Sequence, residues 1–246
     1  MKVIIFNSGR GNRMGEFTDT HHKSMAVLKN GETIFHRQLR LLSSEGVKEF
    51  IVTTGPFEEQ LKKEAADFPD LKFTFVRNEI YDRTNYIYSM YLAREYMDDD
   101  MIFLHGDLVF NRKLVHDVLT CADKNTATVN FKKALPEKDF KGRVKDGKVL
   151  EVSIKIFDED CFAFQPFYKL DRATTAAWLE KVAEFIQKGE DKCYAENALN
   201  EIFSSLNVRA FSYDGYYIDE IDNLEDYARV TAEILPYDKA DSEIFA

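Results

Sequence analysis

The chain opens with a short apolar segment that runs directly into a loop rich in glycine and arginine. Residues 2–6 are mostly apolar, and residues 7–15 contain three glycines and two arginines, with Lys23 eight positions further on. Glycine has no side chain, so backbone N–H groups in such a loop can approach a ligand closely and form concave sites for anions. Guanidinium groups add paired hydrogen bonds to phosphate oxygens. This stretch therefore predicts a polyphosphate site at the end of a buried strand.

Two familiar phosphate-binding patterns do not fit this loop. A dinucleotide fingerprint needs G-x-G-x-x-G, but the third glycine comes one place late, at Gly15, and the second predicted strand ends without a ribose-binding acid. A P-loop needs a glycine directly before its Lys-Ser pair, and Lys23-Ser24 has none. An ordinary glycine-rich turn between a strand and a helix is the structural alternative.

Length and charge narrow the function classes. The 246 residues carry 33 Lys and Arg against 43 Asp and Glu, a net charge of −10. Nucleic acids and anionic membranes favour basic surfaces, so we expect neither as a partner. No apolar run approaches a membrane span, and the N-terminal one is too short for a signal peptide. Three scattered cysteines without a C-x-x-C spacing predict free, buried thiols in a cytoplasmic protein.

The order of apolar segments predicts an α/β fold. Strands are expected at 2–6, 50–54, 71–76, 101–104 and 128–131, with helices between them. This alternation predicts a Rossmann-like mixed, mainly parallel sheet flanked by helices, with ligands outside the carboxyl ends of the strands. Residues 7–15, 54–55 and 105–107 follow such ends.

The second half of the chain has a different pattern. Asp146-Gly147 and Asp214-Gly215 each separate two apolar segments and predict β-hairpins. An aromatic strand over 161–168, helices around 173–187 and 196–206, and a final helix over 223–234 complete the pattern. No linker divides the chain. We expect one domain over 1–246, with a nucleotide-binding half over about 1–132 and an acceptor-binding half with a closing helix over about 133–235.

Several segments together resemble a known family. Ser8-Gly9-x-Gly11, Arg13-Met14 and Lys23 resemble the G-x-G-[ST]-R-[ML]…P-K signature of sugar-phosphate and choline-phosphate nucleotidyltransferases. The runs at 84–90, 106–107 and 220–222 extend the likeness, which covers roughly residues 2 to 230, and are most similar to the choline-phosphate cytidylyltransferase branch. One departure is that His22 stands where the family has proline.

The resemblance implies a nucleotidyltransferase fold of the GT-A-like type and assigns roles to particular residues. Asp107 and Asp222 would bind Mg²⁺, Lys23 the nucleotide phosphates, and Arg13 the departing pyrophosphate. The implied nucleotide contacts are Ser8, Gly9, Arg10, Gly11, Arg13, Thr54, Gly55 and Asn85. The implied acceptor contacts are Glu196, Asn197, Tyr168 and Tyr194.

Each of these residues also has a purely structural interpretation. Asp107 could be a turn aspartate, and Asp222 or Asn85 could cap a helix. Lys23 could be an ordinary surface lysine. Aromatic residues at 162–168, 178 and 216–217 could form a cage for a quaternary ammonium, although core packing is the more frequent explanation. His21 and His22 are interpreted as loop residues.

The resulting hypothesis is a cytidylyltransferase that joins CMP from CTP to a small phosphorylated or phosphonate acceptor similar to phosphocholine and releases pyrophosphate. Decoration of surface polysaccharide or lipid would be the use of such a product. The alternative within the class is a sugar-1-phosphate uridylyl- or thymidylyltransferase. A nucleotide-sugar glycosyltransferase or a silent nucleotide-binding regulator belongs to a different class. The oligomeric state, monomer or homodimer, is left open.

Overall fold

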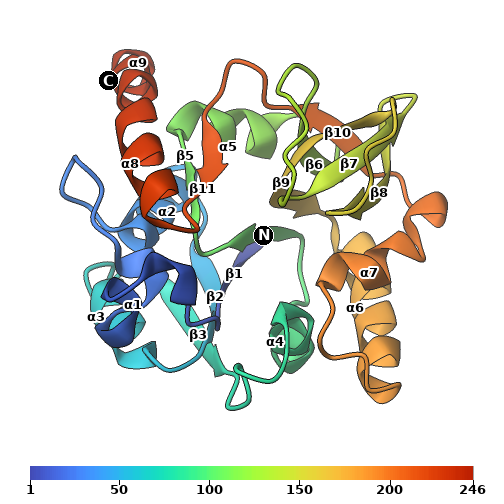
Figure 1. Ribbon diagram of the computed structural model, residues 1–246, viewed down its shortest axis with the longest axis horizontal. Coiled ribbons are helices and arrows are strands. Elements are labelled where there is room, and N and C mark those ends of the chain that lie inside the picture. Colours follow the sequence, from blue (N-terminus) through green and yellow to red (C-terminus); the bar gives the residue numbers. More distant parts are fainter. Residues whose placement is uncertain (246) are drawn as a thin grey trace.

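The computed structural model describes residues 1–245, and its central feature is a nine-stranded mixed sheet with a small second sheet of two strands (Figure 1). The strand order of the large sheet is β3-β2-β1-β4-β9-β6-β10-β8-β7. Its strands are β1 (Lys2–Asn7), β2 (Glu49–Thr54), β3 (Lys72–Arg77), β4 (Met101–His105), β6 (Thr126–Asn130), β7 (Lys141–Lys145), β8 (Lys148–Ser153), β9 (Cys161–Leu170) and β10 (Arg209–Ser212). The small sheet pairs β5 (Leu108–Phe110) with β11 (Ile218–Glu220).

The helices pack around these sheets. They are α1 (Phe17–Thr20), α2 (Ile34–Ser44), α3 (Glu58–Ala65), α4 (Tyr86–Ala93), α5 (Arg112–Thr120), α6 (Arg172–Gln187), α7 (Ala195–Asn200), α8 (Leu224–Glu233) and α9 (Leu235–Ile244). None of the helices in residues 1–245 combines the length and the apolar character needed to cross a bilayer. The last two helices, red in Figure 1, return to the N-terminal half, where Arg37 of α2 lies 3.0 Å from Asp238 of α9.

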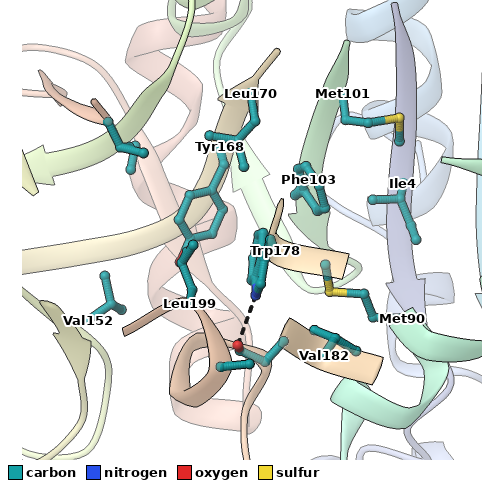
Figure 2. Close-up of a cluster of buried hydrophobic side chains, with 14 of the residues drawn as sticks. Ile4, Met90, Met101, Phe103, Val152, Tyr168, Leu170, Trp178, Val182 and Leu199 are labelled. Atoms are coloured by element: carbon teal, nitrogen blue, oxygen red, sulfur yellow. Dashed lines mark hydrogen bonds between the residues drawn. The ribbon is translucent and has the colours of Figure 1, made fainter. Parts of the chain in front are cut away.

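Two hydrophobic cores lie on opposite faces of the large sheet. Successive side chains of a strand point to opposite faces, so Ile4 of β1 packs in one core while Val3 and Ile5 pack in the other. The core that contains Ile4 also holds residues of α4, α6 and α7, and Figure 2 shows its centre around Trp178. The indole N–H of Trp178 donates to the carbonyl oxygen of Ala195, 3.0 Å away, and so fixes the start of α7.

The predicted parallel order holds for four neighbouring strands but not for β6, which is parallel only to β10. Strands β3, β2, β1 and β4 pair in parallel, but β9 is antiparallel to both β4 and β6, and the hairpin of β7 and β8 is antiparallel as well. The sheet is therefore mixed, and "mainly parallel" is wrong for the second half.

The cysteines are free thiols as predicted, although only Cys161 is buried.

One of the two predicted hairpins forms. Asp146 and Gly147 both have positive φ, 52° and 71°, as a type I′ turn requires, and they join β7 to β8. At the second site Gly215 has a φ of 84°, but Asp214 does not adopt a positive φ. The flanking strands separate there, because β10 pairs with β6 and β8 while β11 pairs with β5. The second hairpin prediction is thus wrong.

Candidate active site

A cavity of about 320 Å³ lies at the carboxyl ends of β1 and β4. It is lined by Phe6, Asn7, Gly9, Gly11, Arg13, His22, Lys23, Asn85, Tyr86, His105, Gly106, Asp107, Lys138, Asp139, Phe140, Ile154, Tyr194, Glu220 and Asp222. Both halves of the chain therefore contribute to one wall. Its location agrees with the rule that ligands bind beyond the carboxyl ends of parallel strands.

The small sheet brings the two predicted aspartates together. Asp107 stands between β4 and β5, and Asp222 follows β11 by two positions. The antiparallel pairing of β5 with β11 sets Glu220 opposite Leu108, and the N–H of Ile221 donates to the carbonyl oxygen of Asp107 at 3.1 Å. The register of this short ladder thus brings the carboxylates of Asp107 and Asp222 close together.

Lys23 lies between these two carboxylates. Its Nζ donates to Asp107 Oδ2 and lies 2.9 Å from Asp222 Oδ1, while Arg13 lies 2.9 Å from the other oxygen of Asp222. The side chain of Lys23 is only 12% exposed, so the lysine is not an ordinary surface residue. Gly11 is required beside it, because its φ of 73° favours glycine and a Cβ there would lie 2.9 Å from Lys23 Cβ.

The charges in this cluster shift one another. Burial opposes the charge of Lys23, but Asp107 and Asp222 outweigh it and raise the lysine pKa above its usual range. Burial likewise opposes ionisation of Asp107, yet the ammonium of Lys23 holds its pKa below the usual value. Glu220 forms no ion pair within residues 1–245, and the charge of Lys23, which lowers its pKa, is outweighed. Its pKa is raised well above the usual value, first by burial and then by the charges of Asp107 and Asp222.

The carboxylates fit a divalent cation. Asp107, Glu220 and Asp222 each offer an oxygen, and these oxygens lie within 4.8 Å of one another. Asp107 Oδ1 is buried without a hydrogen-bond partner in the described chain. The helix-cap interpretation of Asp222 is wrong, because Asn223 caps α8 by accepting from the N–H groups of Glu225 and Asp226. Three carboxylates around an uncompensated oxygen suit Mg²⁺, a hard cation that binds carboxylate and phosphate oxygens.

The predicted nucleotide contacts divide into two groups. Those that line the cavity are Gly9, Gly11, Arg13 and Asn85, whereas Ser8, Arg10, Thr54 and Gly55 do not line it. Asn85 also accepts from the N–H of Tyr86 at the start of α4, so the cap interpretation holds as well.

The second group has contacts elsewhere. Arg10 faces Asp19 at 3.3 Å, and the hydroxyl of Thr54 donates to Glu58 at 2.5 Å. A Cβ on Gly55 would overlap the carbonyl oxygen of Ser8, so close backbone packing accounts for that glycine.

Among the cavity residues that the sequence did not point to, two have buried side-chain atoms without a partner in residues 1–245. Asn7 ends β1 and is 1% exposed, yet neither its amide oxygen nor its amide nitrogen has a partner in residues 1–245. A Cβ on Gly106 would overlap that amide oxygen, so the glycine makes room for Asn7. Buried polar groups are normally paired, and an unpaired amide in a cavity wall indicates a place for a ligand.

His22, assigned above only as a loop residue, is the second. Its Nδ1 accepts from the N–H of Ser24 at 3.1 Å, and burial together with the charge of Lys23 lowers the pKa of the imidazole to about 4. The ring is therefore neutral at pH 7 with its proton on Nε2, which is buried and has no partner in the described residues. The departure from proline at this position was the available signal.

The remaining wall is aromatic, but its rings are not those suggested above for a quaternary-ammonium cage. It consists of Phe6, Tyr86, His105, Phe140 and Tyr194, and their contacts include Phe6 with Tyr86 at 5.0 Å and Phe140 with Tyr194 at 5.0 Å between ring centres.

Among the predicted acceptor contacts, only Tyr194 lines the cavity. Tyr168 packs in the core (Figure 2), which confirms the packing interpretation, and Asn197 is exposed. Glu196 is buried behind the wall, where it accepts hydrogen bonds from the hydroxyls of Tyr86 and Tyr168.

Comparison with known proteins assigns the family. Residues 3–163 match the MobA-like NTP transferase domain family. The chain belongs to this family. A choline-phosphate cytidylyltransferase of Haemophilus influenzae is 24% identical over 240 residues, which cover 96% of this chain and 98% of the relative. A CTP:phosphoglutamine cytidylyltransferase of Campylobacter jejuni is 25% identical over 160 residues, 62% of each chain.

A solved structure supports the same fold. The CTP:phosphocholine cytidylyltransferase of Streptococcus pneumoniae superposes with a TM-score of 0.79 at 19% identity, covering 95% of this chain and 98% of that one. The family match makes this chain a MobA-like nucleotidyltransferase, not a nucleotide-sugar glycosyltransferase. The Asp98-Asp99-Asp100 run, which resembles a glycosyltransferase motif, instead pairs with Lys2 and the N-terminus.

Proposed function

We propose that this nucleotidyltransferase transfers CMP from CTP to a small phosphate or phosphonate that carries a cationic group, with release of pyrophosphate. The main support for this proposal is the composition of the cavity. It contains the Lys23 and Arg13 cations, the three carboxylates and an aromatic wall. The relatives named above are both cytidylyltransferases, which supports CTP as the donor. Acidic and aromatic groups in the wall support a cationic acceptor, because both attract positive charge.

The chemistry follows from charge and position. An oxygen of the acceptor attacks the α-phosphorus of CTP, and the bond from that phosphorus to the bridging oxygen of the β-phosphate breaks, so its electron pair leaves with pyrophosphate. No covalent enzyme intermediate is needed, and catalysis consists of alignment and neutralisation of charge. Lys23 and Arg13 would bind phosphate oxygens once the triphosphate competes for them. Mg²⁺, held by Asp107 and Asp222 with Glu220 beside them, would supply further positive charge to the same oxygens.

The proposal includes a division of the chain. The half before about residue 132 would hold the nucleotide. Gly9, Gly11 and the unpaired polar groups of Asn7 and His22 would contact it. The half after it would hold the acceptor through Phe140 and Tyr194. In this arrangement the continuous sheet fixes the two substrates relative to each other. The product would be a CDP-linked headgroup, suited to decoration of a polysaccharide or lipid.

An assay of pyrophosphate release tests the proposal. The four nucleotides CTP, UTP, ATP and GTP are each combined with phosphocholine, phosphoethanolamine, 2-aminoethylphosphonate and glucose 1-phosphate. We expect release with CTP and a cationic acceptor. A preference for a purine nucleotide would reject the proposed donor, and release with UTP and glucose 1-phosphate would reassign the protein to the sugar-phosphate branch.

A further inference from the structure

Asp139 is a cavity carboxylate that the proposed reaction leaves without a role. It lines the wall between Lys138 and Phe140 and is partly buried. Asp107 and Asp222 are paired with Lys23, whereas Asp139 has neither an ion pair nor a side-chain hydrogen bond within residues 1–245. It is also not part of the three-carboxylate cluster of Asp107, Glu220 and Asp222. This carboxylate is therefore available to a ligand in the cavity.

The segment that carries Asp139 is held firmly in place. Lys141, at the start of β7, is fully buried, and its ammonium donates to the carbonyl oxygens of Pro136 at 3.0 Å and Ile154 at 2.6 Å. Phe140 is buried and packs edge-on against Tyr194. A carboxylate fixed between such anchors is directed at a defined place, which lowers the entropy lost when it binds a ligand.

The surroundings of Asp139 favour a cation as its partner. Burial raises the pKa of Asp139, and the negative charges of Asp222 and Asp219 raise it further. The nearby Lys133 lies 3.2 Å from Asp219 and so is already paired. A positive group that entered the cavity would stabilise the ionised form of Asp139. The aromatic rings of Phe140 and Tyr194 beside it would attract the same group.

We propose that Asp139 selects the acceptor by accepting a hydrogen bond from a protonated amine, so that phosphates and phosphonates with an N–H-bearing ammonium are preferred over quaternary ones. This inference rests on the proposed function and names its acceptor class. A primary ammonium has three N–H donors, as in lysine, whereas a quaternary ammonium has none. The aromatic wall attracts both kinds of cation, so it does not distinguish them. A carboxylate distinguishes them, because only the ammonium that carries N–H groups can donate a hydrogen bond to it.

The test compares acceptors that differ only at this group. With CTP as donor, kcat and KM are measured for phosphoethanolamine, phosphocholine and ethyl phosphate, which has no cation. Wild-type protein should prefer phosphoethanolamine over phosphocholine in kcat/KM by about tenfold or more, the range expected for a hydrogen bond to a charged group. Asp139→Asn keeps an acceptor oxygen but loses the charge, so it should reduce this preference by raising KM for phosphoethanolamine, with kcat nearly unchanged. Its turnover of ethyl phosphate should equal that of the wild type.

Glu137→Gln is the matched control. Glu137 is an exposed acid of the same segment whose side chain lies outside the cavity wall, so this variant should keep the wild-type preference. A wild-type preference for phosphocholine, an unchanged preference in Asp139→Asn, or equal losses with all three acceptors would each overturn the role of Asp139 while leaving CMP transfer intact. If wild-type protein transfers CMP to none of the acceptors, the proposed function fails, and this inference fails with it.

Discussion

The ammonium of Lys23 lies 2.9 Å from the carboxylate of Asp222, although 199 positions separate the two residues. The same ammonium contacts Asp107, so two partly buried acids share one cation. Removing one partner of a buried ion pair leaves an uncompensated charge, which destabilises a fold strongly. Lys23 is therefore expected to contribute to stability as well as to turnover.

Lys23→Met tests both contributions. We expect kcat to fall by about 10²–10³, as for loss of one electrostatic stabiliser. We also expect the variant to have a lower melting temperature than the wild type in chelator. Mg²⁺ should raise the melting temperature of the variant more than that of the wild type, because a metal bound only by the folded state stabilises that state. Lys62→Met, at a partly exposed lysine of α3 that lies outside the cavity wall, is the control. Near-normal turnover in Lys23→Met would return Lys23 to a purely structural role.

His22 predicts a pH dependence of stability. Its pKa is lowered from 6.5 to about 4 in the folded protein, so between these values the unfolded state binds the proton more readily. Stability is therefore lost as pH falls from about 6.5 to 4, by roughly 3 kcal/mol at pH 4. His22→Asn retains a capping side chain but cannot titrate, and its unfolding free energy should fall less over this range. The exposed His21→Asn should behave like the wild type, and parallel curves for all three proteins would contradict the assignment.

Two glycines give opposite predictions. In Gly55→Ala the new Cβ meets the backbone carbonyl of Ser8, which cannot move aside, so the melting temperature should fall markedly. In Gly106→Ala the Cβ meets the end of the Asn7 side chain, which can rotate away. This variant should fold but lose activity, and Asn7→Ala should show a similar loss with no additional effect in the double variant. Additive losses would show that Asn7 and Gly106 act independently.

Glu196 is predicted to act through Tyr86. The buried carboxylate of Glu196 accepts a hydrogen bond from the hydroxyl of Tyr86. Tyr86 lines the cavity, whereas Glu196 lies behind the cavity wall. Glu196→Gln and Tyr86→Phe should therefore each raise KM for the acceptor more than they lower kcat. The double variant should be no worse than the poorer single one, because coupled residues are not additive. A multiplicative loss would instead indicate that Glu196 contacts the acceptor directly.

The first half of the fold could be predicted because its strands alternate with helices along the chain. The pairing of β5 with β11 could not, because it joins segments more than 100 positions apart. The Asp214-Gly215 pattern indicates a turn, but it does not say which strand pairs with the residues that follow it. The ninth helix, α9, was not predicted from the sequence; Pro236 stands in its first turn, where proline is well tolerated.

The site shows the same division. Lys23, Asp107 and Asp222 were found through the family resemblance, and the structure brings them together. Asn7, His22, Asp139 and Glu220 were given no role from the sequence, although Glu220 lies in the run at 220–222. Their importance lies in burial and missing partners, which become visible only when distant segments meet.

The central claim is nucleotidyl transfer at the carboxylates of Asp107 and Asp222, and the most direct measurement is Mg²⁺-dependent pyrophosphate release from CTP by Asp107→Asn and Asp222→Asn. Each change keeps the side-chain size but removes the charge. We expect both variants to stay folded, to lose most of their activity, and to respond weakly to Mg²⁺, while Glu225→Gln, at an exposed acid nearby, retains wild-type activity. Full activity of Asp222→Asn in excess chelator would contradict the account.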